Sequence, residues 1–267
     1  MGKFNYTTNI TGYRSMAVRR AIYRRSSLKY CCNRPQYRMG KITMESSIMK
    51  ESLSKIPSTS DLLPVSYESS KPKIFCLHGG GQSASSFELQ LIDLMNALPE
   101  FEFVFAETPE IGNVWIRDPP DGKDHPTTDP DWARKSHLYL DQIVREEGPF
   151  YAILGYSQGG AMVLAYLAYL QENNKLISFE KVILFNSYFP ETHYGLMSSI
   201  RNLLTEVPIF KIVGKNDILF YELGKTVYDE LKNSDNIITL IEDEILGHYP
   251  PLKGYSSFKE VVNFINY

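Results

Sequence analysis

The chain has 267 residues, of which 43% are hydrophobic and 22% charged, and its formal net charge is −3. This length and composition fit one large or two small globular domains and exclude a wholly disordered chain. Three cysteines, two of them adjacent (Cys31 and Cys32), exclude a disulfide framework and favour a reducing compartment.

Charge is distributed unevenly along the chain. Residues 1–50 hold eleven Lys and Arg against one acid, whereas residues 51–267 hold 17 bases and 30 acids. We expect residues 1–70 to be a basic, disordered extension and linker ahead of a domain at residues 71–267. The Arg- and Ser-rich start resembles a mitochondrial presequence and lacks the apolar stretch of a secretory signal. The expected location is therefore cytoplasmic or mitochondrial, not secreted; an untargeted tail, or sequence upstream of a start at Met39 or Met44, is the alternative.

Several function classes lack their sequence signatures. No CxxC or HExxH pattern indicates a metal, and no Gly-rich phosphate loop indicates a nucleotide, so we expect no cofactor. The longest apolar run, about Ala161–Leu170, is half of the roughly 20 residues that a membrane-spanning helix needs, so no integral membrane segment is expected. The acidic body argues against a nucleic-acid partner. The sequence does not indicate an oligomeric state.

From Lys73 onward, short apolar runs alternate with segments of helical spacing. Strands are predicted at 73–77, 101–106, 151–154, 181–185, 207–213 and 237–241. Helices are predicted at 83–98, with Ser83 as N-cap, and at 131–147, 158–171, 218–231 and 255–265. This alternation predicts the α/β class, with a mostly parallel central sheet covered by helices on both faces. Residues 107–130 are polar and aperiodic, which is typical of a functional or mobile loop.

The segment Gly155–Gly159 reads G-x-S-x-G and lies between a predicted strand and a predicted helix. That context is the one in which a sharp turn exposes a nucleophilic serine, here Ser157. The flanking glycines are needed because side chains there would collide with neighbouring backbone. The helix that follows aims its unpaired N–H groups at developing negative charge. An idle serine in a Gly-rich turn is the alternative.

A serine nucleophile needs a base, and the base needs an orienting acid. In α/β-hydrolases these follow in the order Ser, Asp or Glu, His. His248, just past the last strand, is the predicted base, because His193 comes too early in the chain. Asp217, after the strand at 207–213, is the predicted acid; the alternative is that it only caps the next helix. The backbone N–H groups of Gly80 and Gln158 are the predicted oxyanion donors, with Gly81 as the next choice to Gly80.

Together these motifs resemble the FSH family of serine hydrolases within the α/β-hydrolase superfamily. The resemblance covers about residues 73–265 and rests on six elements: Leu77–Gln82, Trp115–Arg117, Gly148–Phe150, Leu154–Gly160, Gly214–Asp217 and Gly247-His248. It implies the α/β-hydrolase fold, a carboxylesterase- or thioesterase-like activity, no metal, and a triad of Ser157, Asp217 and His248. Gly160 and Met162 stand where the family often has small alanines, and the basic extension is outside its pattern.

We therefore expect an enzyme that cleaves a carboxylic ester or thioester of a small acyl substrate through an acyl-enzyme. The alternatives are a binding protein on a hydrolase scaffold and a hydrolase of peptide or carbon–carbon bonds. Trp115 and Trp132, in and just after the aperiodic loop, are candidate walls of an acyl pocket or else core residues. Seven acids at 107–131 would discourage polyanionic substrates.

Overall fold

A computed structural model describes residues 70–120 and 125–267, so the predicted extension at 1–70 falls almost wholly outside the described residues. Within the described part, six strands form one parallel sheet in the order β2-β1-β3-β4-β5-β6. The strands are β1 (Lys73–Leu77), β2 (Glu102–Ala106), β3 (Ala152–Tyr156), β4 (Lys181–Phe185), β5 (Ile209–Gly214) and β6 (Ile238–Asp243). All six predicted strands are present, with ends that differ by at most two residues.

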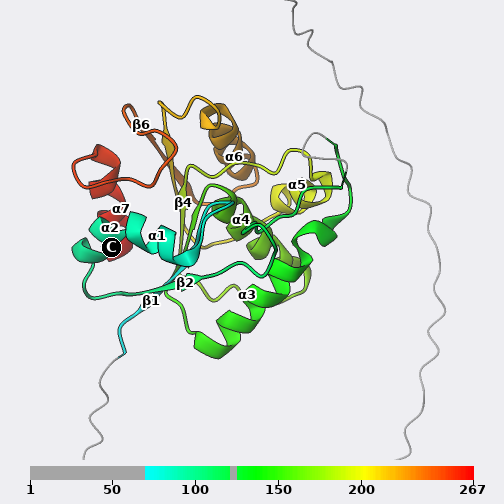
Figure 1. Cartoon of the computed structure of the whole chain (residues 1–267), viewed down its shortest axis with the longest axis horizontal. Coiled ribbons are helices and arrows are strands. Elements are labelled where there is room, and N and C mark those ends of the chain that lie inside the picture. Colours follow the sequence, from blue (N-terminus) through cyan, green and yellow to red (C-terminus); the bar gives the residue numbers. More distant parts are fainter. Residues whose placement is uncertain (1–69, 121–124) are drawn as a thin grey trace, which may run out of the picture. The chain divides into compact units, whose positions relative to one another are not determined.

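Two helical layers cover the sheet because alternate residues of each central strand face opposite sides. In β1, Phe75 and Leu77 pack into one core and Ile74 and Cys76 into the other. One layer contains α1 (Ala84–Gln90), α2 (Ile92–Ala97) and α7 (Ser256–Asn266). The other contains α3 (Arg134–Glu147), α4 (Gln158–Glu172), α5 (Tyr194–Arg201) and α6 (Tyr221–Asn233). Figure 1 shows α1, α2 and α7 on one side of the sheet and α3, α4 and α5 on the other.

The α/β class and the helical cover on both faces are thus confirmed. Strand register places the carboxyl ends of β3, β4 and β5 side by side, since Tyr156 pairs with Phe185 and Phe185 with Ile212. The loops that follow these strands therefore meet at one edge of the sheet, where sites of open α/β sheets form.

Some helix boundaries differ from the prediction. The helix expected at 83–98 breaks at Leu91, where φ is −97° and ψ 8°, although Ser83 caps its start as predicted. The helix expected from Ile218 begins at Tyr221, because the Asp217 carboxylate accepts the N–H of Phe220 and closes a turn first. Helix α5 was not predicted: it has eight residues and includes Gly195, so its apolar period is short.

The aperiodic segment 107–130 is largely irregular where it is described, as expected, and ends in the short 3-10 helix η1 (Pro130–Ala133). Thr127 pairs with His193 in an isolated parallel bridge, and its N–H donates to Thr192 O at 2.7 Å. This bridge joins the end of the loop to the chain that precedes α5.

Candidate active site

Ser157 occupies the sharp turn between β3 and α4. Its φ of 52° and ψ of −121° lie in a region that costs a non-glycine residue about 1–3 kcal/mol and persists only where the surrounding structure enforces it. A Cβ at Gly155 would lie 2.6 Å from Gly160 Cα, and one at Gly159 would lie 2.3 Å from Leu77 O. The two glycines of the motif are therefore required by close backbone approach, which is the reason the sequence indicated.

Three predicted residues from different loops lie in a line. Ser157 Oγ is 2.9 Å from His248 Nε2, and His248 Nδ1 is 2.5 Å from Asp217 Oδ2. With the ring proton on Nδ1 donated to the carboxylate, Nε2 is free to accept the serine hydroxyl proton. Asp217 is only 4% exposed, whereas the His248 side chain is 29% exposed. This arrangement is able to deprotonate Ser157 and to stabilise the imidazolium that results.

The loops that carry Asp217 and His248 are packed directly on each other. A Cβ at Gly214 would lie 2.1 Å from Leu246 O, so only glycine permits this approach. Asn216 N donates to Leu246 O at 3.0 Å, and the Tyr156 hydroxyl donates to His248 O at 2.7 Å. Backbone contacts therefore set the separation between acid and base.

Asn186, at the end of β4, joins both loops and was missed by the sequence analysis. Its Oδ1 accepts the N–H of Gly214 at 2.8 Å, and its Nδ2 donates to Gly247 O at 3.1 Å and to Tyr249 O at 2.9 Å. The residue is 2% exposed and has a φ of 45°, which asparagine tolerates better than most residues. The only sequence signal was a polar residue directly after a buried strand.

The two predicted oxyanion donors lie beside each other. A Cβ at Gly80 would lie 3.2 Å from Gln158 Oε1. Neither Gly80 N nor Gln158 N donates a hydrogen bond within the described residues, whereas Gly81 N donates to Asn113 O at 2.7 Å. The occupied Gly81 N–H favours Gly80 over Gly81 for this role, and the role itself stays a prediction.

The Gln158 side chain also fixes the neighbouring loop. Its Oε1 accepts the backbone N–H of Trp115 at 2.8 Å, and its Nε2 donates to Ile116 O at 3.2 Å. The Trp115 indole donates to His78 O at 2.8 Å, and Trp115 is fully buried. Trp115 is therefore a core residue that supports the glycine loop.

A cavity of about 230 Å³ lies next to Gln158 and is called the Gln158 cavity below. The residues that line it are Ile116, Asp118, Gln158, Tyr188, Phe189, Pro190, Glu191, Thr192, His193, Phe220 and Leu223. Neither predicted tryptophan is among them, because Trp115 is buried beneath the loop and Trp132 donates to Thr127 Oγ1 and packs under Arg117. Their predicted role as acyl-pocket walls therefore gains no support from this cavity.

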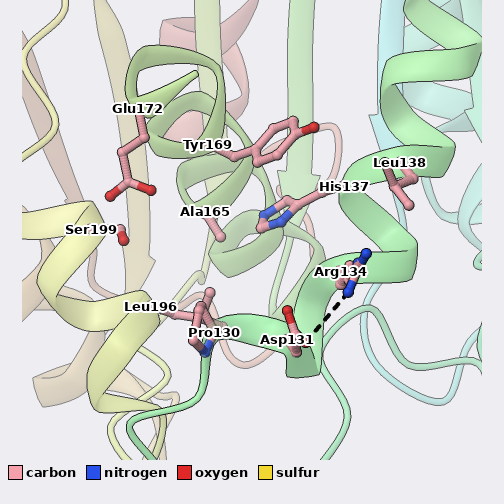
Figure 2. Close-up of a pocket in the computed structure, with 10 residues that line it drawn as sticks. All are labelled: Pro130, Asp131, Arg134, His137, Leu138, Ala165, Tyr169, Glu172, Leu196 and Ser199. Atoms are coloured by element: carbon pink, nitrogen blue, oxygen red, sulfur yellow. Dashed lines mark ion pairs between the residues drawn. The ribbon is translucent and has the colours of Figure 1, made fainter. Parts of the chain in front are cut away.

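A larger cavity of about 340 Å³, lined by residues of η1, α3, α4 and α5, contains none of the triad candidates (Figure 2). His137 stacks there on Tyr169, with ring centroids 4.6 Å apart, and burial lowers the His137 pKa to about 4. Arg134 pairs with Asp131 at 3.6 Å (Figure 2). We therefore relate the smaller cavity, not this one, to the triad.

Lys211 is fully buried. It lies on β5, and its Nζ donates to Ser187 O at 2.9 Å and to Ser187 Oγ at 2.8 Å. Burial lowers the Lys211 pKa to about 7, although the charge of Asp217 opposes this fall. A lysine in a strand that reads as an apolar run was not singled out in the sequence.

Among residues 70–120 and 125–267, no group of three His, Cys, Asp or Glu side chains is placed to hold a metal ion. In the same residues no helix is long and apolar enough to cross a membrane.

A family model described as serine hydrolase (FSH1) matches residues 67–253. The chain belongs to this serine hydrolase (FSH1) family. The predicted family resemblance is thus confirmed. Among curated relatives of this FSH1-family chain, esterase alnB of Emericella nidulans is 33% identical over 138 residues, which are 46% of this chain and 47% of alnB. Esterase citA of Monascus ruber is 34% identical over 125 residues, 38% of this chain and 46% of citA. The chain spans about half the length of these relatives.

Solved structures show that the FSH1-family chain has an α/β-hydrolase fold. Maize acyl-protein thioesterase 2 superimposes with a TM-score of 0.55 at 19% identity, over 73% of this chain and 93% of the maize protein. SOBER1 of Arabidopsis thaliana gives a TM-score of 0.55 at 22% identity, over 74% of this chain and 98% of SOBER1. At these identities the likeness concerns the fold.

Proposed function

We propose that this FSH1-family chain hydrolyses a carboxylic ester or thioester of a small acyl substrate. The observation that carries the proposal is the unbroken line from Asp217 through His248 to Ser157, at 2.5 Å and 2.9 Å. Family membership and the esterase relatives support the same activity. The strained backbone at Ser157 adds support, since such strain clusters at active sites.

In the proposed reaction, Ser157 Oγ attacks the carbonyl carbon while its proton passes to His248 Nε2. Asp217 holds the imidazole in the required tautomer and stabilises the imidazolium. The tetrahedral oxyanion is bound by the N–H groups of Gly80 and Gln158, which have no internal acceptor within the described residues. His248 then gives its proton to the leaving alcohol or thiol, and the acyl-enzyme forms.

Water completes the cycle by the same route in reverse. His248 Nε2 takes a proton from water as the water oxygen attacks the acyl carbon, and the proton then returns to Ser157 Oγ as the acid is released. The exposed part of the His248 side chain leaves room for water to reach it.

A kinetic comparison tests the proposal. We expect the natural chain to hydrolyse p-nitrophenyl esters or acyl thioesters of graded chain length. The rate of Ser157→Ala should be at least about 10³-fold lower. Ser198→Ala, on the exposed face of α5, is the matched control and should keep full activity. Equal rates for Ser157→Ala and the natural chain would refute the assignment of the nucleophile.

We further propose that residues 71–267 are the hydrolase domain, that residues 1–70 are a basic extension and linker, and that the protein is located in mitochondria or in the cytoplasm. The proposal is supported by the basic, acid-poor composition of residues 1–50. Residues 1–70 fused to a fluorescent protein should enter mitochondria if they are a presequence, and a fusion with Arg19, Arg20, Arg24 and Arg25 changed to Gln should not. A diffuse cytoplasmic signal for both fusions would contradict mitochondrial targeting.

A further inference from the structure

The Gln158 cavity adjoins the groups that would perform the chemistry. Gln158 lines it, and the backbone N–H of the same residue is one of the two proposed oxyanion donors. Phe220, which also lines the cavity, stacks on the His248 ring with centroids 4.5 Å apart. A substrate carbonyl bound at the Gln158 N–H would therefore extend one of its substituents into this cavity.

The substituent that best fits is the acyl group. The leaving group must depart before water attacks, whereas the acyl group stays attached to Ser157 through both half-reactions. A cavity next to the nucleophile is therefore better suited to bind the acyl group, which stays attached to Ser157, than the leaving group. The volume of about 230 Å³ is below the roughly 300–1,000 Å³ usual for small-molecule sites, so the acyl group must be compact.

Several of the residues that line the cavity are apolar. Ile116 and Phe189 are each 2% exposed, and Tyr188 packs on Phe220 with ring centroids 5.1 Å apart. The segment that supplies Tyr188–His193 is held by the bridge between His193 and Thr127. These contacts present a preformed apolar surface to the first carbons of an acyl chain.

Two exposed residues that line the cavity are acidic. Asp118 and Glu191 are among its lining residues, and none of those residues is Lys or Arg. The Arg117 Nε, one residue before Asp118, lies 3.0 Å from Glu110 Oε1, and the Arg117 guanidinium packs over Trp132. The Glu191 side chain makes no hydrogen bond or ion pair within the described residues. A negative group at the end of a bound acyl chain would thus face like charge and find no described cation in the cavity wall.

Tyr188, Thr192 and His193 are uncharged polar or aromatic residues that line the cavity. Burial, with a smaller contribution from the charge of Asp118, raises the Tyr188 pKa to about 12, so the Tyr188 hydroxyl stays protonated at neutral pH. Both ring nitrogens of His193 lie within hydrogen-bond distance of protein oxygens, Arg117 O at 2.8 Å and Thr192 Oγ1 at 3.3 Å. The interior is therefore suited to neutral groups.

We propose that the Gln158 cavity selects compact, uncharged acyl groups and rejects acyl groups that end in a carboxylate, with Glu191 as a specificity-determining residue. This inference rests on the proposed hydrolase function. It assigns the substrate class as esters or thioesters of short neutral monocarboxylic acids and excludes half-esters of dicarboxylic acids. Rejection arises from repulsion and from the cost of desolvating a carboxylate next to another.

The test compares two p-nitrophenyl esters with the same leaving group and six-carbon acyl chains, hexanoyl and its analogue ending in a carboxylate. The full chain should hydrolyse the neutral ester with a kcat/KM at least about tenfold higher, which corresponds to one like-charge contact of about 1.4 kcal/mol. Glu191→Lys should lower this ratio at least about tenfold, and Glu191→Gln should lower it less. Raising the salt from about 10 mM to about 1 M should also lower the ratio of the natural chain, because salt screens the repulsion.

Glu206→Gln is the matched control, since Glu206 is an exposed acid ahead of β5, at the opposite end of that strand from Asp217, and should leave the ratio unchanged. Leu223→Trp, which fills the cavity, should lower kcat/KM for the hexanoyl ester more than for the acetyl ester. Equal rates on both six-carbon esters by the natural chain, or a ratio that Glu191→Lys does not change, would overturn the cavity proposal. If the natural chain hydrolyses no ester and is not labelled by a fluorophosphonate, the proposed function itself fails.

Discussion

Lys211 is the residue whose replacement most directly tests the electrostatics behind the triad. Its ammonium group is fully buried, donates only to Ser187 O and Oγ within the described residues, and has no carboxylate within salt-bridge distance there. Lys211→Met keeps an unbranched side chain of similar length and removes the charge. We expect the stability of this variant, compared with that of the natural chain at the same pH, to be higher at neutral pH than at alkaline pH.

The size and sign of the effect follow from the Lys211 pKa, which burial lowers from 10.5 to about 7. Below pH 7 both folded and unfolded states hold the proton, and the folded state bears the full desolvation cost. Between about pH 7 and 10.5 the unfolded chain binds more protons, so the stability of the natural chain rises with pH. At about 1.4 kcal/mol per pH unit the whole effect is roughly 5 kcal/mol, of which about 2 kcal/mol falls between pH 7 and pH 9.

The assay is urea unfolding of the natural chain and Lys211→Met at each pH from 6 to 10. The free energy of unfolding of the variant minus that of the natural chain should fall by about 2 kcal/mol between pH 7 and pH 9. The lost hydrogen bonds to Ser187 shift this difference by an amount that does not depend on pH. A difference that stays constant over this range would show that Lys211 keeps its proton in the folded state and would refute the reasoning.

Substitutions at three further positions give distinct outcomes. Asp217→Asn retains an acceptor for the Phe220 N–H and should keep its thermal stability while kcat on an ester falls about 10⁴-fold. A fall in Tm with a kcat that drops only as far as the folded fraction would point to a capping role alone. Gly159→Ala places a Cβ 2.3 Å from Leu77 O and should abolish soluble folded protein or lower Tm by more than about 10 °C, so an unchanged melting curve would contradict the turn geometry. Asn186→Ala removes three hydrogen bonds from Asn186 to the triad loops and should lower stability by about 2–4 kcal/mol in urea unfolding, while ester kinetics should show a larger fold-decrease in kcat than fold-increase in KM; Asn186→Asp keeps the acceptor for Gly214 N but sets a buried carboxylate oxygen against Gly247 O and Tyr249 O, so it should be no more stable than Asn186→Ala at neutral pH.

The sheet and the line of triad candidates were predictable because their signals are local and ordered. Strands buried on both faces read as apolar runs, and the loops at their carboxyl ends must meet at one edge. Ser157, Asp217 and His248 each follow such a run, so their approach could be expected from chain order before any distance was known.

What the sequence did not indicate depends on contacts between distant segments. The Asn186 side chain forms hydrogen bonds with the backbone of Gly214 and Gly247, which are 28 and 61 residues away, and no sequence pattern near Asn186 predicts these partners. Six consecutive residues that line the Gln158 cavity, Tyr188–His193, belong to a stretch without period between β4 and α5. Tryptophans are found both in cores and in pockets, so the place of Trp115 under the glycine loop was decided by packing.

The most direct measurement of the central claim is the site of covalent labelling by a fluorophosphonate. The natural chain should gain the mass of one phosphonyl group, located on Ser157 in the tryptic peptide 146–175, and His248→Ala should react at least about 10³-fold more slowly. Ser157→Ala should gain no mass. Labelling that persists in Ser157→Ala, or a natural chain that does not react, would contradict the account.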